Sequence, residues 1–374
     1  MTLTSNQGPH SGTNAFKGSS HGNVVRRRFS LMWRRFNLEI RLVVMVALLA
    51  FLATRIDILQ SLHSLGEANV GYLAASVCVV FLGWSVNTYK WRFLLEAGHL
   101  KCRMLDLFRL NLAAIFYGLA LPGQATGEVI KAIRLGSRSD RRSTIYASVL
   151  ADRISGLGSL AMLGLIGLLV GPTPIEYARG RQLDALILAT AAVASLAALI
   201  LPSLLTGTSQ RSSASYATGL RTQLGRVIQK FADGWIRLRS DQLLVVLALG
   251  CVFQASNIGA NWLLARGLRL DVSPLSMAWI TALFSLIQLM PVSIGGIGVR
   301  EATFVSLLGV YGIAGYQAVG LSLGAFGELI LLGLVGFGLD TAMNRRSRRM
   351  SAVAADAESA GSAPTPGGRQ NSER

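Results

Sequence analysis

The chain alternates long apolar stretches with short basic ones. A helix crosses the hydrocarbon core of a bilayer with about 20 predominantly apolar residues. Six stretches meet that requirement, at residues 39–59, 70–89, 143–170, 183–205, 242–265 and 316–341. The pattern therefore predicts an all-α polytopic membrane protein with six full spanning helices.

Two further apolar stretches, 106–134 and 274–313, are interrupted by proline and glycine. The first is broken at Pro122, Gly123 and Gly127, and the second at Pro291, Gly295, Gly296 and Gly298. Non-helical backbone at membrane depth is tolerated where protein or a water-filled cavity surrounds it. We therefore predict that each stretch forms a re-entrant helical hairpin, which enters the membrane and returns to the side from which it came.

Lysine and arginine are concentrated on alternate connections between the apolar stretches. The N-terminal arm, the loop that begins at Lys90, the loop 206–241 and the tail from residue 344 are rich in them, whereas 60–69 has none and 171–182 has two. Basic connections remain in the cytoplasm, so both termini are expected there, in a multi-pass protein of the bacterial inner membrane. The first hairpin then opens to the cytoplasm and the second to the opposite side.

The order of helix, helix, hairpin and helix occurs twice. Residues 39–170 form the first repeat and 183–341 the second, which starts from the opposite face. Inverted repeats of this kind bring paired broken helices together near the midplane, where they form the substrate site. The composition of the basic arm (1–38) and of the tail (344–374) indicates disorder, and the cytoplasmic loop 206–241 has the spacing of an amphipathic helix on a membrane surface.

Composition agrees with a membrane protein and narrows the chemistry. Hydrophobic residues make up 51% of the chain and charged residues 15%, which leaves too little polar surface to coat a soluble globule. The net charge of +17 reports topology, because no polar stretch is long enough to fold into a nucleic-acid-binding domain. The three cysteines and four histidines show neither disulfide nor metal-ligand spacing. We therefore expect no cofactor, no metal and no nucleic-acid partner.

Charged residues inside the apolar stretches are the candidate functional groups. Each costs at least a few kcal/mol in a membrane, so a chain that carries them there pairs them or uses them. The candidates for substrate binding are Glu128, Lys131, Arg134, Asp152, Arg153, Arg300 and Glu301, and Glu328 is the candidate coupling group. They would lie beside a lipid headgroup that bears a phosphate.

Each candidate also has a structural alternative. Asp152 and Arg153 would form an internal ion pair, or Arg153 would extend to the cytoplasmic surface. Glu128, Lys131 and Arg134 would belong to a basic interfacial face. Glu301 would cap the half-helix that follows the glycines, and Glu328 would be a buried structural acid. Arg300 has the forked donors that suit phosphate, next to backbone N–H groups at a half-helix N-terminus.

Several of these residues together resemble a known family. They are Pro122-Gly123 with Gly127-Glu128, then Asp152-Arg153, then Pro291 with the stretch Gly295-Gly296-Ile297-Gly298-Val299-Arg300-Glu301. Over roughly residues 40–341 the chain resembles the lysylphosphatidylglycerol synthase transmembrane family. The resemblance implies the flippase part of proteins that make and translocate aminoacylated phosphatidylglycerol, without their aminoacyl-transfer domain, and stand-alone members are associated with glycolipid, polyprenyl-lipid or hopanoid pathways.

The main hypothesis is therefore a transporter, not an enzyme, which moves a lipid or lipid-linked headgroup between leaflets. No Walker-type ATP motif is present, which leaves proton or ion coupling or downhill movement. An integral-membrane transferase that modifies a headgroup, with Glu128, Asp152 or Glu301 as acid or base, is the first alternative. A non-catalytic membrane partner of a separate lipid synthase or glycosyltransferase is the second.

Overall fold

The computed structural model describes residues 50, 54 and 56–361, except 121–125, 138, 175–176, 209–237 and 290–295. Most of the predicted span 39–59 lies outside the described residues, as does most of the loop 206–241. Four of the predicted hairpin-break residues, Pro122, Gly123, Pro291 and Gly295, also lie outside them. Within the described part the protein is all-helical, with ten helices and no strand.

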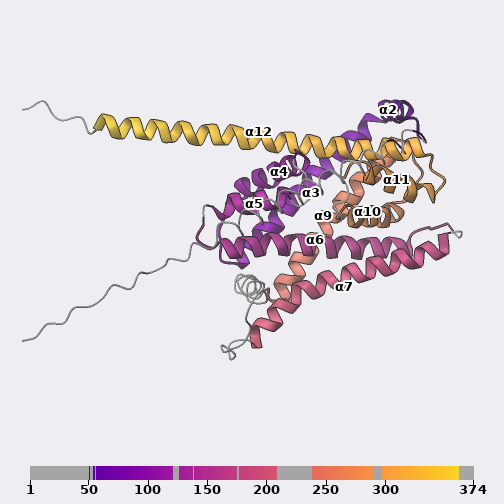
Figure 1. Ribbon diagram of the computed structural model, residues 1–374, viewed down its shortest axis with the longest axis horizontal. Coiled ribbons are helices and arrows are strands. Elements are labelled where there is room, and N and C mark those ends of the chain that lie inside the picture. The colour runs from indigo at the N-terminus through magenta and orange to yellow at the C-terminus, as the bar shows by residue number, and fades with distance from the viewer. Residues whose placement is uncertain are drawn as a thin grey trace, which may run out of the picture.

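Five helices are long and apolar enough to cross a membrane. They are α3 (Val70–Ala97), α6 (Arg142–Val170), α7 (Ala178–Thr208), α9 (Ser240–Gly267) and α12 (Gly315–Gly361). In α7 and α12 the apolar parts are Gly180–Ile200 and Gly315–Ala342. The prediction of a multi-pass, all-α membrane protein is confirmed by these helices (Figure 1).

The two broken stretches form two pairs of short helices. In the first pair, α4 (Met104–Ala120) packs against α5 (Thr126–Gly136), and in the second, α10 (Pro274–Gln288) packs against α11 (Val299–Gly309). Both pairs are antiparallel. In the second pair, for example, the rings of Phe284 and Phe304 lie 4.6 Å apart, while Trp279 contacts Tyr311 beyond the end of α11.

Gly127 allows the first pair to pack closely. A Cβ atom at this position would lie 2.1 Å from the carbonyl oxygen of Ala114, a separation that no side chain tolerates. Four residues later, the Lys131 ammonium donates a hydrogen bond of 3.0 Å to Asn111 on α4. The glycine that the sequence indicated as a break therefore lies at a close contact between α4 and α5.

The two helix pairs open toward opposite ends of the molecule (Figure 1). The connections at residues 171–174, 268–273 and 310–314 share one end, where Tyr311 and Ser276 both donate hydrogen bonds to the carbonyl of Pro172. The connections at 98–103 and 139–141 lie at the other end, which we call the basic end because these connections carry Lys101, Arg103 and Arg141. The N-terminus of α4 and the C-terminus of α5 therefore both face the basic end. The N-terminus of α10 and the C-terminus of α11 both face the opposite end.

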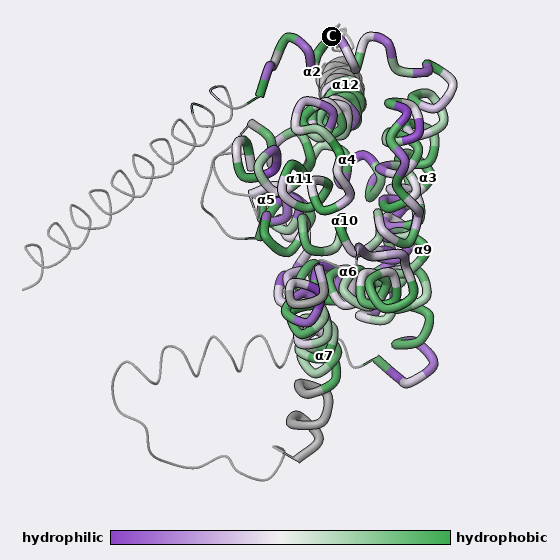
Figure 2. The backbone as a smooth tube through the Cα atoms, turned by 90° about the vertical axis from the view of Figure 1, so that its right-hand side faces the viewer, coloured by the Kyte–Doolittle hydropathy of each residue, from purple (hydrophilic) through white to green (hydrophobic). Residues whose placement is uncertain are grey.

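Each short pair packs on the last long helix of the other half of the chain. Helix α4 lies along α12 and α10 lies along α6, while α3 and α9 lie side by side between them. Glycines allow the close contacts, because a Cβ at Gly336 would meet Leu112 at 2.3 Å and one at Gly167 would meet Leu275 at 2.4 Å. The view along the long axis shows α12 and α7 at opposite margins of the molecule (Figure 2).

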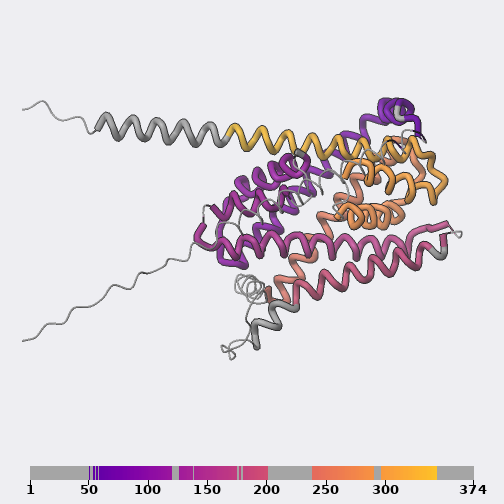
Figure 3. Tube along the Cα trace, in the orientation of Figure 1, coloured from indigo at the N-terminus to yellow at the C-terminus, as the bar shows by residue number. Residues whose placement is uncertain are grey.

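Three boundaries differ from the sequence predictions. Lys90 does not begin a loop: α3 continues to Ala97, because Lys90 is neutralised inside the fold and Trp91, Leu94 and Leu95 are buried. Residues 60–69 are mostly helical, since α2 (Ile58–Gly66) extends through them from its start at Ile58, where Asp57 accepts a hydrogen bond from the Gln60 N–H. Helix α12 continues past residue 344 to Gly361, through an alanine-rich segment without proline that favours helix (Figure 1). Its apolar part, Gly315–Ala342, is the coloured part of α12 in Figure 3.

Candidate functional site

A cavity of about 300 Å³ lies where the two helix pairs approach each other. Side chains from both pairs and from α3, α6, α9 and α12 line it. Its charged residues are Glu128, Arg153, Arg300 and Glu328, and its amides are Asn111, Asn257, Asn261 and Gln288. Four residues predicted from the sequence as site residues are thus brought together from four different helices.

Two lysines and two carboxylates form a cluster next to the cavity, which one of them, Glu128, lines. The ammonium of Lys131 lies 2.7 Å from Glu128 Oε2 and 3.6 Å from Asp152 Oδ2, and that of Lys90 lies 3.1 Å from Asp152 Oδ1. Both lysines are at most 1% exposed. We call Lys90, Glu128, Lys131 and Asp152 the lysine cluster. Its charges balance, which is the condition for keeping ions in a low-dielectric interior.

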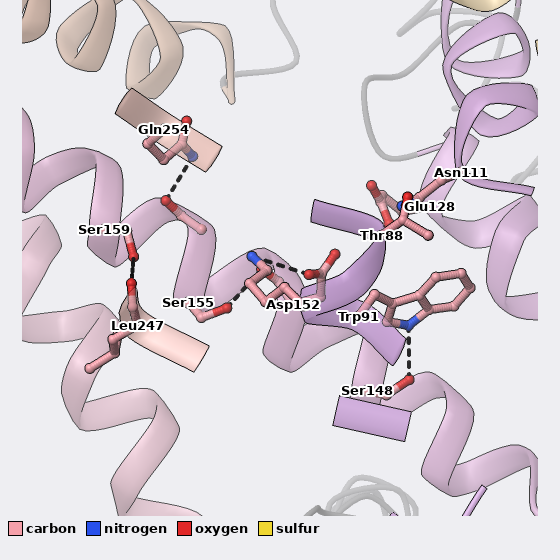
Figure 4. Close-up of polar contacts among 12 residues, drawn as sticks. Thr88, Trp91, Asn111, Glu128, Ser148, Asp152, Ser155, Ser159, Leu247 and Gln254 are labelled. Carbon is pink, nitrogen blue, oxygen red and sulfur yellow. Dashed lines mark hydrogen bonds and ion pairs between the residues drawn. The ribbon is translucent and has the colours of Figure 1, made fainter. Parts of the chain in front are cut away.

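Polar and aromatic neighbours fix the position of Lys131. Asn111 accepts its hydrogen bond and in turn donates one of 3.1 Å to Thr88. The ammonium also lies 4.4 Å from the centroid of the Trp91 ring, whose indole N–H donates to Ser148 (Figure 4). Because Lys131 is held on three sides, it fixes Glu128 at the wall of the cavity.

Arg153 has a different environment from its neighbour Asp152. Successive residues of an α-helix point about 100° apart, given 3.6 residues per turn. Asp152 therefore points toward Lys90 and Lys131, while Arg153 lines the cavity. The alternative of an internal ion pair between Asp152 and Arg153 is wrong. Among the described residues, Arg153 has no hydrogen-bond or ion-pair partner.

Arg300 and Glu301 begin α11 at the other side of the cavity. Glu301 accepts hydrogen bonds from the Gly298 N–H at 2.6 Å and from the Arg300 guanidinium at 2.8 Å, and the hydroxyl of Ser322 on α12 completes the group. Gly296 and Gly298 have positive φ angles of 78° and 86°, which only glycine adopts readily. Glu301 thus caps the half-helix, as its structural alternative proposed, and it holds Arg300 at the cavity wall.

Glu328 lies on α12 between the two helix pairs. Its carboxyl group accepts a hydrogen bond from the hydroxyl of Ser76 on α3. The residue is 9% exposed and lines the cavity. None of the described cations forms an ion pair with it, so Glu328 differs from Glu128, Asp152 and Glu301, which all have one.

Arg134 does not join the other candidates. Its guanidinium lies 2.7 Å from Asp340 on α12 and also donates to the hydroxyl of Tyr117. It faces the basic end of the molecule, about a turn and a half of α5 beyond Glu128. This position agrees with the interfacial alternative for Arg134 rather than with a place beside the other charged residues.

Sequence reasoning missed several residues of the site. Lys90 was assigned to a loop, although the apolar residues on both sides of it were a signal that the helix continues. Asn111 stands among Leu, Ala and Ile in an apolar stretch, and such a buried amide is itself a signal of a polar contact. Among the described residues, no three His, Cys, Asp or Glu side chains are grouped to hold a metal ion.

Comparison with protein families matches residues 38–336 to the lysylphosphatidylglycerol synthase TM region. The chain belongs to this family. The matched residues include both helix pairs and all four charged residues of the cavity. The site therefore lies within the part of the chain that matches the lysylphosphatidylglycerol synthase TM region. No curated protein matches the chain.

Proposed function

We propose that the protein moves a phosphate-bearing lipid headgroup between the leaflets of the bacterial inner membrane. The observation that carries this proposal is the charged cavity between two helix pairs that open to opposite ends of the molecule. Its lining combines Arg153, which is unpaired among the described residues, with a carboxyl group at Glu328 and several amides. A hydrophobic substrate would need no such lining, whereas a polar headgroup would.

The inverted-repeat hypothesis agrees with the packing of the helices. Helix α4 of the first half packs on α12 of the second, and the corresponding helix of the second half, α10, packs on α6 of the first. Helices α3 and α9, which also correspond, pack on each other. With the basic end in the cytoplasm, α4/α5 would be a re-entrant hairpin from the cytoplasm and α10/α11 one from the opposite side. Opposed broken helices that meet at a polar site are the arrangement of alternating-access transporters.

Each charged group has a role in this proposal. Arg153 contacts the phosphate, because it has donors to spare, and Arg300 adds a second guanidinium from the other helix pair. Glu128 and Glu328 accept hydrogen bonds from headgroup hydroxyl or amino groups. The lysine cluster and the Arg300–Glu301 pair hold these groups in place, and Glu328 is the candidate group for proton coupling because none of the described cations pairs with it.

The test is lipid movement in proteoliposomes. Fluorescent analogues of phosphatidylglycerol and of a polyprenyl phosphate are followed between leaflets, for the unaltered protein and for Arg153→Gln, Glu328→Gln and Arg141→Gln. Arg141 is an exposed cation at the basic end, outside the cavity, so its variant is the matched control. Movement lost in the first two variants and kept in the third supports the proposal.

The same vesicles test the transferase alternative. Lipids are extracted and their headgroups are analysed by mass spectrometry after incubation with candidate donors. A modified headgroup without movement would replace transport with headgroup chemistry. If neither movement nor modification occurs with folded protein, a role as the membrane partner of a separate synthase or glycosyltransferase gains support.

A further inference from the structure

A second hollow lies at the basic end, apart from the central cavity. It has a volume of about 590 Å³ and lies between the α3–α4 connection, α4, α5 and α12. Four cations line it, Lys101, Arg103, Arg109 and Arg134, together with two carboxylates, Asp106 and Asp340. We call this hollow the basic pocket.

The two carboxylates do not satisfy the four cations. Asp340, which is 4% exposed, forms an ion pair with Arg134 at 2.7 Å. The Arg109 side chain is 11% exposed, and its nearest carboxylate oxygens, on Asp106 and Asp340, are both 3.8 Å away. That distance exceeds hydrogen-bond length, and Arg109 Nε is buried without a hydrogen-bond partner.

Lys101 and Arg103 stand at the mouth of the basic pocket. Both are exposed, and neither forms an ion pair within the part of the chain that the structure describes. Deeper inside, the pocket has an apolar wall that includes Leu107, Leu110 and Ile145. The hollow therefore offers an excess of positive charge, one buried unsatisfied donor and an apolar side.

We propose that the basic pocket binds a phosphate-bearing anion, presented by a phospholipid headgroup of the adjacent leaflet or by a free phosphate. Guanidinium groups form strong charge-assisted hydrogen bonds with phosphate oxygens. Basic pockets between membrane helices at the cytoplasmic side suit anionic headgroups. The anion supplies the acceptor that Arg109 Nε lacks and balances Lys101 and Arg103.

This inference does not depend on lipid movement through the central cavity. The basic pocket shares no lining residue with that cavity. A protein that fails to move any lipid would still bind an anion here, and a failure to bind would leave the central site unaffected. The two proposals therefore stand or fall on different measurements.

Cys102 provides the reporter, because it lines the basic pocket and is half-buried. The full chain with Cys78→Ser and Cys251→Ser is placed in nanodiscs, and alkylation of Cys102 by N-ethylmaleimide is followed over time. One arm compares phosphatidylcholine with phosphatidylcholine mixed with phosphatidylglycerol. The other arm adds millimolar inorganic phosphate to discs of phosphatidylcholine alone.

Three variants separate binding from general effects of surface charge. Arg103→Gln and Arg109→Gln remove lining cations, and Arg141→Gln removes an exposed cation outside the pocket. A control thiol outside the pocket is provided by Ser143→Cys in a chain that also carries Cys102→Ser. Ser143 is exposed at the start of α6 and does not line the pocket, so its alkylation reports effects of the anion on the surface in general. Arg103 is exposed, so its variant should fold even if Arg109→Gln does not.

We expect a several-fold slower reaction of Cys102 when the anion is present, lost in Arg103→Gln and Arg109→Gln and kept in Arg141→Gln. Protection by phosphatidylglycerol identifies a lipid headgroup, and protection by inorganic phosphate identifies a free anion. Equal rates in all three conditions, with phosphatidylcholine alone, with added phosphatidylglycerol and with added phosphate, would overturn the proposal. So would protection that persists in Arg103→Gln, or an equal slowing at Ser143→Cys.

Discussion

Asp152 carries one negative charge that two buried ammonium groups share. Lys90 and Lys131 lie 3.1 and 3.6 Å from its oxygens, and the three residues come from α3, α5 and α6. Removing one partner of a buried ion pair leaves an uncompensated charge, which typically costs about 3–5 kcal/mol. We therefore expect Asp152→Asn to lower the midpoint of thermal unfolding clearly, as measured by intrinsic fluorescence in detergent.

The matched control for that change is Asp140→Asn, an exposed carboxylate at the basic end, which should leave the midpoint nearly unaltered. Adding Lys90→Met to Asp152→Asn removes the stranded ammonium and leaves Lys131 with Glu128, so the double variant should recover part of the loss. Equal midpoints for Asp152→Asn and Asp140→Asn would show that the lysine cluster is not a structural requirement.

The thiol of Cys102 yields a prediction about pH. Burial raises the pKa of this thiol above its ordinary value, and the charges of Asp106 and Glu96 raise it further. Because the thiolate is the reactive form, a raised pKa lowers the thiolate fraction near pH 8. We expect slow alkylation at pH 8 that accelerates roughly tenfold per pH unit and continues to rise above the ordinary thiol pKa.

Asp106→Asn should lower the pKa of Cys102 and shift that alkylation profile toward lower pH, whereas Asp140→Asn should not. The measurement is the rate of reaction with N-ethylmaleimide from pH 7 to pH 10, with Cys78 and Cys251 replaced by serine. A profile that levels off at or below the ordinary pKa of a thiol would contradict the expected direction of the shift.

At the scale of helices, two glycines of α12 make a matched pair. A Cβ at Gly336 would meet backbone and side-chain atoms of Leu112 on α4 at 2.3 to 2.5 Å, whereas one at Gly338 would meet nothing within 4 Å. Gly336→Ala should therefore separate α4 from α12 and cost about 1–3 kcal/mol. Gly338→Ala should be neutral or slightly stabilising, because alanine favours helix.

Thermal unfolding of the two single variants in detergent checks this prediction. Each variant adds one methyl group to α12, at positions two residues apart, so the change in helix propensity is the same in both. Gly336 is buried and Gly338 is exposed, so a difference between the variants reports the packing at Gly336. If Gly336→Ala is as stable as Gly338→Ala, the close packing of α4 on α12 does not exist in the folded protein.

The sequence predicted helices better than it predicted their partners. Apolar length sufficed for α3, α6, α7, α9 and α12, because a helix in lipid must satisfy its backbone hydrogen bonds within itself. The two helix pairs were indicated by proline and glycine. Lys90 was misplaced, because a charge at the end of an apolar run looks like the start of a basic loop until its partner Asp152, 62 residues later, is known.

At the scale of the whole molecule, the candidate site joins residues from distant parts of the chain. Glu128, Arg153, Arg300 and Glu328 were chosen individually, as charges inside apolar stretches, and the fold brings them to one cavity. The sequence alone does not show that these residues meet, because they lie far apart along the chain. Neutral lining residues such as Asn257 carry no charge that would mark them as part of the site. Arg134 was grouped with Glu128 by helical spacing, yet Asp340 of α12 holds it at the basic end, outside the cavity.

The topology of the whole molecule gives the last prediction. If α4/α5 and α10/α11 are re-entrant, the two flanks of each pair face the same side of the membrane, and the two pairs face opposite sides. Single cysteines at Lys101 and Ser139 flank the first pair, and single cysteines at Gly309 and Asp271 flank the second; Ser139 is half-buried and the other three positions are exposed. In spheroplasts, a membrane-impermeant maleimide should label the second two, and the first two only after permeabilisation. Labelling of Lys101→Cys and Ser139→Cys from different sides would mean that α4/α5 crosses the membrane, which would remove the inverted repeat and the alternating access built on it.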